Sequence, residues 1–500
     1  MKNTAKLFKI LTALFLVAIG VLIGKTFFNS TGDQLIPMPN SMRYKTATVS
    51  DSTATKPEIF NGKILVVKNG QSIQKAVEKA SPGDIVRVFP GTYHETVYID
   101  KDHISLQGIV QNGSWPILDG EKKLNDAILY SGDRISVENF KIMRYKGNAI
   151  MGQAGNNFII RNNWIIDTGV YGIFPQYGKN GLIEHNVLSG IEDAAIYVGM
   201  CDNVDVLHNE VFNNVAGIEI ENSRHCLVEN NYSHDNTGGI LIFVTPGLPI
   251  KTTFDVIVRN NFVVNNNHEN FGAPGSTVST IPPGTGILIM AADDVIIENN
   301  IISNNDTGGI IITDLENGDP KANDPNVEGN PDRVIILDNL MYENGNHPIG
   351  ELKALMLANL KTKAPDIFAY GGGVGSTILD KNKYRTFGLS AFGIPSISDT
   401  QDVPTMMLPQ LVAPRSVSKE QLGELTYFGI CAGCHAMGSR LIGVDTEIIQ
   451  AIYAGNPEGI VDYISNPKNL REDYPEMPPQ NYLTEEAKIA VAEYLLKLKN

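Results

Sequence analysis

The most specific chemical pattern in the 500 residues lies near the C-terminus, in the run Cys431-Ala432-Gly433-Cys434-His435. Two thiols three positions apart can add to the two vinyl groups of one heme, and the adjacent imidazole can bind its iron. A thioredoxin-like redox pair or half of a zinc site would use the same residue types. Both fit less well, because no second CxxC and no further His follow His435. The pattern therefore predicts one covalently bound heme c.

The iron of such a heme needs a second axial ligand, and two methionines follow the motif. Met437 is too close to His435 in sequence to reach the opposite face of the ring. Met477 is followed by two prolines and precedes a helix that we expect to begin after Thr484. Met477 is therefore the candidate for the distal ligand.

This arrangement resembles the class I cytochromes c, in which a Met-Pro pair before the last helix supplies the axial thioether. The resemblance implies that residues 419–500 form a small all-α cytochrome c domain. It also implies that Cys431 and Cys434 bind heme covalently and that His435 and Met477 bind the iron. A His/Met pair fills both axial positions, which suits electron transfer rather than oxygen binding. Redox donor and acceptor proteins are the implied partners.

The N-terminus carries a targeting segment. An uncharged apolar run spans residues 10–24 and follows the basic residues Lys2, Lys6 and Lys9. This length is typical of a signal-peptide core and short for a membrane span of roughly 20 residues. We expect residues 1–28 to be a cleaved signal peptide or an uncleaved inner-membrane anchor, and residues 29–58 to be a linker. Both alternatives place the rest of the chain outside the cytoplasm, in the periplasm or cell envelope.

A repeat of about 23 residues occupies most of the chain. Asparagines that follow short β-branched runs recur in steps of 24, 23, 23, 22, 30, 39 and 39 residues, at Asn139, Asn163, Asn186, Asn209, Asn231, Asn261, Asn300 and Asn339. Small residues that open strands, from Gly172 to Gly309, recur with a similar period. Two markers with one period indicate a stacked solenoid. We expect the asparagines from Asn163 to Asn339 to form a structural hydrogen-bond ladder.

Three short strands and their turns fill one such repeat, which predicts a parallel β-helix over residues 59–394. The segment Ser72–Ala80 has the spacing of an amphipathic helix that would cover the open end of the solenoid. Together with the strand pattern that follows, this start resembles the right-handed β-helix proteins of the pectin-lyase-like class. The predicted fold is therefore mainly β, a right-handed parallel β-helix solenoid plus a small all-α domain.

One face of the predicted solenoid has an unusual composition. If Ile173, Ile196, Ile218 and their equivalents point inward, the outward positions beside them are largely apolar and aromatic. Loops could bury this face, or it could stack a polysaccharide or dock the cytochrome domain. Glu219 and Glu221 lie within it, where desolvation should raise their pKa, so they are the catalytic candidates. His225, His234 and Asp235 are expected to lie on nearby turns and to be solvated or hydrogen-bonded there.

These carboxylates support an alternative function, a redox-linked carbohydrate-active enzyme of lyase, epimerase or oxidising type. The run Tyr171-Gly172-Ile173-Phe174-Pro175-Gln176 resembles the YGFDPH stretch of alginate C5-epimerases. Phe174 and Gln176 stand where that family has its catalytic Asp and His. Neither side chain can perform the proton transfer, so the resemblance argues against that mechanism. Whether the chain is an enzyme stays open at this point.

Composition sets the remaining limits. The chain has 42% hydrophobic and 19% charged residues and a formal charge of −15, so we expect no nucleic-acid partner. Its 47 glycines and 26 prolines predict many turns. The other two cysteines, Cys201 and Cys226, are out of phase with the repeat and are expected to be buried free thiols. Residues 395–418 are expected to be a flexible linker.

Overall fold

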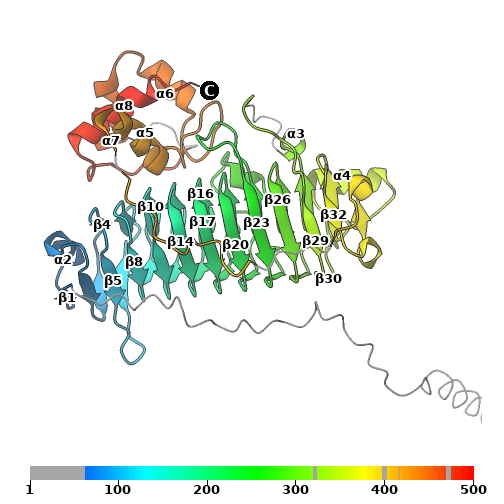
Figure 1. The fold of residues 1–500 in the computed structure, drawn as a ribbon, viewed down its shortest axis with the longest axis horizontal. Helices are drawn as coiled ribbons and strands as arrows, with labels where there is room; N and C mark the ends of the chain where they lie inside the picture. Colours follow the sequence, from blue (N-terminus) through cyan, green and yellow to red (C-terminus); the bar gives the residue numbers. More distant parts are fainter. Residues whose placement is uncertain (1–61, 319–323, 397–402, 416, 469–473, 500) are drawn as a thin grey trace, which may run out of the picture. The chain divides into compact units, whose positions relative to one another are not determined.

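The computed structural model describes residues 62–318, 324–396, 403–415, 417–468 and 474–499. The predicted signal peptide or anchor at 1–28 and the linker at 29–58 lie outside these ranges. Residues Asn61–Asn500 form one compact unit, with a parallel β-helix followed by C-terminal helices (Figure 1). Within the described ranges, no helix is long and apolar enough to cross a membrane.

Three parallel sheets form the β-helix. Sheet A contains β1 (Ile64–Val67), β2 (Ile85–Val88), β5 (Ser105–Gly108), β8 (Ser136–Glu138), β11 (Ile159–Arg161), β14 (Lys179–Glu184), β17 (Asp202–Leu207), β20 (Arg224–Glu229), β23 (Phe254–Arg259), β26 (Asp293–Glu298), β29 (Ile335–Leu337) and β32 (Thr377–Ile378). Sheet B contains β3 (Gly91–Tyr93), β6 (Pro116–Asp119), β9 (Lys141–Met143), β12 (Trp164–Ile166), β15 (Val187–Ser189), β18 (Glu210–Phe212), β21 (Tyr232–His234), β24 (Phe262–Val264), β27 (Ile301–Ser303) and β30 (Leu340–Tyr342). Sheet C contains β4 (Val97–Ile99), β7 (Ile128–Tyr130), β10 (Ile150–Gln153), β13 (Ile173–Gln176), β16 (Ala194–Gly199), β19 (Ala216–Glu221), β22 (Gly238–Phe243), β25 (Thr285–Met290), β28 (Gly308–Thr313), β31 (Ile367–Tyr370) and β33 (Thr386–Phe387). The predicted parallel β-helix is confirmed.

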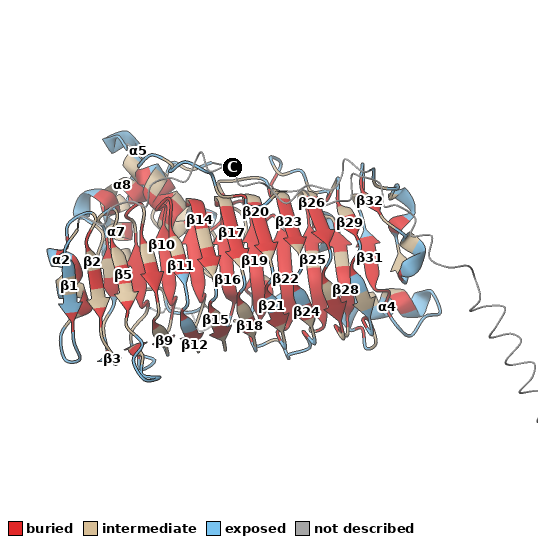
Figure 2. Cartoon of the chain, turned by 60° about the horizontal axis from the view of Figure 1, so that its bottom comes forward, coloured by how far each residue is buried: buried red, intermediate tan, exposed pale blue. Residues whose placement is uncertain are grey.

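The core of the solenoid is built from columns of β-branched side chains. In sheet C, Ile173 lies beside Ile196, and Ile218 lies beside both Ile196 and Ile240 in the next coil. These four side chains are fully buried. Figure 2 shows the central strands of sheet C, such as β16, β19 and β22, coloured as buried. Strand residues alternate between the two faces of a sheet, so this register places the residues between the isoleucines on the outer face. The inward orientation predicted from the sequence is therefore confirmed.

The predicted asparagine ladder is present. Each member from Asn163 to Asn300 donates through Nδ2 to Oδ1 of the asparagine in the next coil, over a distance of 3.0 Å. The same Oδ1 also accepts the backbone N–H of the preceding asparagine, as Asn209 does from Asn186 at 3.0 Å. A second ladder, which was not predicted, runs five residues further along each coil through Asn214, Asn236, Asn266, Asn305 and Asn344.

A short helix covers the N-terminal end of the solenoid, as predicted. Helix α2 (Ile73–Lys79) begins after its N-cap Ser72, whose hydroxyl accepts the Lys75 N–H. Its apolar side chains Ile73 and Val77 are buried in the main core. The carboxylate of Glu95 accepts the N–H groups of the first helical turn, at 2.8 Å from Ile73 N. The helix thus closes an end of the core that would otherwise expose unpaired strands.

Helices form the C-terminal part of the chain and the loops of the last coils. They are α3 (Leu315–Gly318), α4 (Gly350–Ala358), α5 (Lys419–Thr426), α6 (Thr446–Ile452), α7 (Pro457–Ser465) and α8 (Glu485–Leu495), with the short turns η2 (Thr277–Thr280), η3 (Lys381–Lys383), η4 (Leu389–Ala391) and the π-helical η6 (Tyr427–Cys431). Helices α5 and α8 cross closely, because Gly423 lets its backbone approach the Ala490 carbonyl. Thr484 caps α8 through the Ala487 N–H, as expected.

Residues 403–415, the described part of the predicted linker, are attached to the solenoid. This segment runs along the outside of sheet A and is hydrogen-bonded to successive coils. The Asp205 carboxylate accepts the Met406 N–H at 2.8 Å, and Asn180 accepts the Leu408 N–H at 2.8 Å. Composition alone does not reveal this attachment, because the binding groups, Asp205 in β17 and Asn180 in β14, lie 200 or more residues earlier in the chain.

Candidate functional site

The CxxCH run lies on a tight helical turn that follows α5. The N–H groups of Cys434 and His435 donate to the Cys431 carbonyl at 3.1 and 3.0 Å, so the turn places both thiols and the imidazole close together. Both cysteines are free and half-buried. Burial raises the pKa of each thiol to about 12, so both are protonated at neutral pH. The turn therefore offers two thiols and one imidazole without any change in its backbone.

The imidazole of His435 is oriented by the backbone. Its Nδ1 lies 2.7 Å from the Val444 carbonyl oxygen, which can only accept a hydrogen bond. Nδ1 must therefore carry the proton, and Nε2 keeps its lone pair in the neutral ring. Burial lowers the pKa of His435, which favours the neutral form. Gly443 packs against this ring, where a Cβ atom would collide with it. These residues fit the donor set that a c-type heme requires.

Met477 lies half-buried in an irregular segment ahead of α8. Two contacts hold this segment. Lys146 pairs with Glu476 at 2.8 Å, and the Arg440 guanidinium lies 3.9 Å from the centre of the Tyr474 ring. Both anchored residues, Tyr474 and Glu476, therefore come just before Met477 in the sequence. Its role as a distal ligand stays a prediction.

The CxxCH turn packs on the outer face of sheet C. A Cβ atom on Gly433 would lie 2.6 Å from Phe174 Cζ, so only glycine allows this approach. The Gln176 amide donates to the Phe428 carbonyl at 3.0 Å, and the Tyr482 ring lies 4.8 Å from that of Tyr98. Phe174 is consequently fully buried. The sequence left open what covers this apolar face, and the structure buries it under the C-terminal segment and the loops together.

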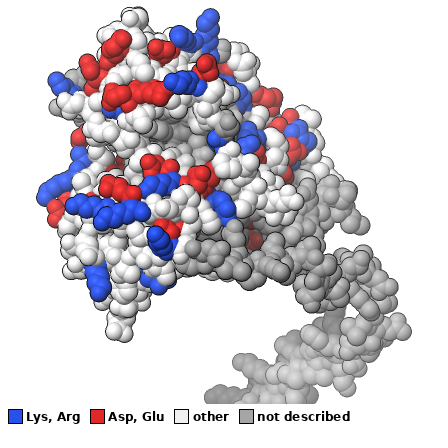
Figure 3. Space-filling view, turned by 60° about the vertical axis from the view of Figure 1, so that its left-hand side comes forward, with Lys and Arg blue, Asp and Glu red and all other residues white. Residues whose placement is uncertain are grey.

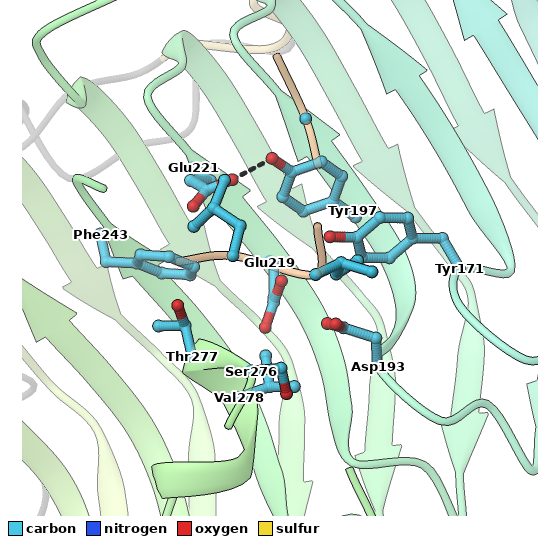
Figure 4. Close-up of a pocket in the computed structure, with 12 residues that line it drawn as sticks. Tyr171, Asp193, Tyr197, Glu219, Glu221, Phe243, Ser276, Thr277 and Val278 are labelled. Atoms are coloured by element: carbon cyan, nitrogen blue, oxygen red, sulfur yellow. Dashed lines mark hydrogen bonds between the residues drawn. The ribbon is translucent and has the colours of Figure 1, made fainter. Parts of the chain in front are cut away.

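A pocket containing three carboxylates lies at this interface (Figure 4). Glu219 and Glu221 come from β19, and Asp193 lies immediately before β16. The structure thus places both predicted candidates in one pocket and adds a third acid. The pocket is lined by Tyr171, Asp193, Tyr197, Glu219, Glu221, Phe243, Ser276, Thr277, Val278, Gly433, Leu441 and Ile442.

The three acids differ in how they are satisfied. Glu221 accepts hydrogen bonds from the hydroxyls of Tyr197 and Thr245. Oε1 of Glu219 and Oδ1 of Asp193 are buried and have no hydrogen-bond partner among the described residues. Desolvation, followed by repulsion from neighbouring carboxylates, raises the pKa of Glu219 and of Asp193 well above the ordinary range. The raised pKa predicted for Glu219 is therefore present.

The acidic residues of this pocket are clustered in the interior rather than on the surface. On the face drawn in Figure 3, basic and acidic side chains are interspersed rather than separated by sign. Asp193 and Glu219, in contrast, are only 6% and 1% exposed. A group of acids that is withdrawn from solvent needs a local explanation, because burial of a charge is costly without a partner.

Asp193 and Tyr171 were not among the predicted catalytic or binding residues. The strand register aligns position 193 with Val170 and Val215 in the neighbouring coils. Asp193 could therefore have been recognised in the sequence, because it is an acid at a position that is apolar in the neighbouring coils. Tyr171 stacks on Tyr197 with 4.5 Å between ring centres and an interplanar angle of 9°. That contact joins consecutive coils and follows from the register, which the sequence gives only approximately.

The other predicted residues lie outside the pocket. Cys201 and Cys226 are free buried thiols, as expected. The prediction that His225 and His234 are turn residues is wrong, because His225 lies in β20 and His234 ends β21. His225 contacts Asp202 through Nδ1 at 2.6 Å, and His234 contacts Asp235 at 2.7 Å, so both form local hydrogen bonds.

A family model described as "right handed beta helix region" matches residues 126–268. The β-helix is therefore right-handed, as expected from the resemblance. The match lies entirely within the solenoid. No curated protein is significantly similar to this chain in sequence.

Three solved structures with similar folds are informative about the solenoid. The A-module of mannuronan C-5 epimerase AlgE4 from Azotobacter vinelandii is 13% identical, with 63% of this chain and 84% of that chain covered and a TM-score of 0.44. An alginate lyase from Paenibacillus sp. is 15% identical, with 58% and 98% covered and a TM-score of 0.43. A tailspike protein of an E. coli bacteriophage in complex with a pentasaccharide is 12% identical, with 64% and 60% covered and a TM-score of 0.38. These neighbours are carbohydrate-active or carbohydrate-binding proteins, but likeness at this level carries no argument about the chemistry of this chain.

Proposed function

We propose that this chain is an extracytoplasmic electron-transfer protein that carries one covalently bound heme c. The observation that carries the proposal is the CxxCH turn, in which the Val444 carbonyl fixes the His435 ring and leaves Nε2 available. Cys431 and Cys434 would hold the group covalently, and His435 and Met477 would bind its iron. When bound, the heme would supply a one-electron carrier whose axial positions are both filled.

The chain's own residues have separate tasks in this proposal. His435 presents a neutral imidazole, and the hydrogen bond from its Nδ1–H to Val444 prevents the ring from turning. Phe174, which is fully buried, packs under Gly433 and excludes water from this side of the motif. The β-helix is thus a platform that shields the motif. A donor and an acceptor protein, which lie outside this chain, would be its redox partners.

Three variants test heme attachment. Cys434→Ser should strongly reduce heme staining of the denatured chain on a gel, because one of the two thioether bonds is lost. The double substitution Cys201→Ser, Cys226→Ser is the matched control, and it should leave the staining unchanged. Unchanged staining in Cys434→Ser would overturn the proposal. Met477→Ala should keep the covalent heme but change its absorption spectrum and lower its midpoint potential, and an unaltered spectrum would remove Met477 from the ligand set.

A second candidate function is a redox-linked carbohydrate-active enzyme with its site in the acid pocket. The observation that favours it is the pair of buried carboxylates, Glu219 and Asp193, each of which has one oxygen (Oε1 and Oδ1) without a hydrogen-bond partner among the described residues. A protonated Glu219 could act as a general acid, because its pKa is raised by desolvation. The epimerase mechanism is not part of this candidate, since Gln176 donates to Phe428 and Phe174 is packed in the interface.

Turnover of a glycan panel tests the second candidate. Purified protein is incubated with polyuronates and with neutral polysaccharides, and new reducing ends and unsaturated products are measured. Activity that is lost in Glu219→Gln and kept in Glu210→Gln, a carboxylate of sheet B, would support the enzyme. Absence of turnover on the whole panel would leave electron transfer as the single proposed function.

A further inference from the structure

The acid pocket lacks a positive charge. No Lys, Arg or His is among the described residues that line it. Figure 4 shows the carboxylates of Glu219 and Asp193 pointing toward one another, while that of Glu221 points to Tyr197. Ionised carboxylates in such a place are costly unless a proton or a bound cation neutralises them. The two unpartnered oxygens, on side chains at most 6% exposed, therefore point to a missing positively charged ligand.

Aromatic rings form the other wall of the pocket. Tyr171 and Tyr197 are stacked, and Phe243 lines the pocket from the strand two coils further along. Ring faces attract cations, and an organic ammonium group is held well by rings and carboxylates together. A metal ion would instead need several oxygen ligands arranged around one point. The combination of acids and rings therefore favours an ammonium group.

We propose that this pocket binds the ammonium group of a small primary amine between Glu219, Asp193 and the aromatic rings. The pocket is narrow, so it accommodates a head group rather than a polymer. Ser276 and Thr277, from the loop before β25, line a further side and offer hydroxyls to a polar substituent. The proposal goes beyond electron transfer and does not require bound heme.

Protons and the amine compete for the same carboxylates. Below the raised pKa of Glu219 and Asp193, both acids are neutral and attract an ammonium group weakly. Raising the pH removes these protons, so the affinity should rise with pH as long as the amine itself stays charged. The other titratable groups that line the pocket are Glu221, Tyr171 and Tyr197. Burial raises the pKa of both tyrosines well above the ordinary value, so they stay neutral over this range.

Three ligands of similar size separate charge from shape: ethanolamine, ethylene glycol and glycolate. The full chain is titrated with each by calorimetry, in sodium phosphate buffer free of amines, at pH 6 and pH 8. Saturable binding of ethanolamine is expected, tighter at pH 8, with at least about tenfold weaker binding of the neutral and anionic ligands, a difference of about 1.4 kcal/mol. Equal binding of ethylene glycol, tight binding of Ca²⁺ in a parallel titration in phosphate-free buffer, or no saturable binding of ethanolamine would each overturn the proposal.

Isosteric variants assign the binding to the pocket. Glu219→Gln keeps the shape of the side chain and should weaken ethanolamine binding at least about tenfold. Asp193→Asn should do the same, and it serves as the second variant if Glu219→Gln does not fold. Glu210→Gln, on β18, should leave the affinity unchanged. Binding that persists in both pocket variants would contradict the assignment. Heme absorbance is recorded on the same samples, so a failure of the heme proposal shows separately.

Discussion

Two sets of buried polar side chains occupy the same β-helix and differ in how they are satisfied. In the asparagine ladder, the Nδ2 and Oδ1 atoms of each interior member are hydrogen-bonded, as in Asn231, which donates to Asn261 and accepts from Asn209. In the acid pocket, the oxygens of Glu219 and Asp193 stay unpartnered among the described residues. Both sets are almost completely withdrawn from water. The two sets are therefore both buried, and they differ in whether hydrogen-bond partners are present.

This difference separates a structural role from a functional one. A fully satisfied polar column rigidifies the solenoid and fixes its register, because each amide bridges two coils. A partly satisfied acid cluster costs stability, and proteins retain such sites where a ligand or a reaction requires them. The ladder is repeated in successive coils, whereas the pocket occurs where the C-terminal segment covers sheet C. The two sets should consequently respond in opposite ways to removal of their polar groups.

The largest change in the free energy of unfolding is expected for a substitution in the asparagine ladder. Asn231→Ala removes the acceptor of the Asn209 N–H and the donor to Asn261, leaving buried polar groups unpaired. Each such group costs about 1–3 kcal/mol, so we expect a loss of about 3 kcal/mol or more in the free energy of unfolding. Denaturant unfolding followed by circular dichroism measures it. The exposed Asn330→Ala is the control, and equal stability of the two variants would mean that the ladder is not structural.

In the pocket, removal of the Glu219 carboxylate should increase the free energy of unfolding, and the size of the increase should depend on pH. The folded chain holds the proton of Glu219 above its ordinary pKa of 4.5, whereas the unfolded chain releases it. The folded state therefore binds more protons, and its stability falls as the pH rises above that value. Glu219→Gln removes this titration, so the decline should be shallower by up to about 1.4 kcal/mol per pH unit.

Unfolding free energies at pH 5 and pH 8, in amine-free buffer, check this prediction. The variant should be more stable than the wild type at pH 8 and nearly equal to it at pH 5. Glu210→Gln should follow the wild-type curve. A variant that is destabilised equally at both pH values would show that Glu219 is a satisfied structural residue like those of the ladder.

The smallest effect is expected on the outside of sheet A, where polar side chains are satisfied by a distant segment. Asp205→Ala removes the carboxylate that accepts the Met406 N–H and the Thr405 hydroxyl. Global stability should fall by about 1 kcal/mol, while amide exchange in residues 405–412 should become faster. Hydrogen exchange read by mass spectrometry measures both regions, with Asp235→Ala as the control. Unchanged exchange in this segment would mean that Asp205 does not hold the linker.

The spacing of residues along the sequence predicts the features that repeat in each coil. It does not predict features that depend on contacts between distant residues. The steps between Asn163 and Asn339 predict the solenoid, because a ladder needs one asparagine per coil. The second ladder through Asn214 follows the same steps and was missed, although the signal was present. Glu219 and Glu221 were found because they interrupt an apolar strip. Asp193 lies outside a strand and joins them only through the register of the coils.

The contacts of the C-terminal segment could not be predicted in the same way. The packing of Gly433 on Phe174 and the attachment of Met406 to Asp205 join residues that are 200 or more positions apart in sequence. No local pattern encodes such a pair, because it depends on how distant parts of one compact unit pack together. The residues of the CxxCH motif, in contrast, were recognisable because their chemistry depends on spacing along the chain.

The intact mass of the denatured chain tests the central claim most directly. The full chain and its Cys431→Ser, Cys434→Ser variant are produced in a host that attaches heme to a control cytochrome c in the same culture. The account predicts that the wild-type chain exceeds the variant by the mass of one heme, after correction for the two substitutions. Equal masses, with the control cytochrome fully loaded, would contradict it.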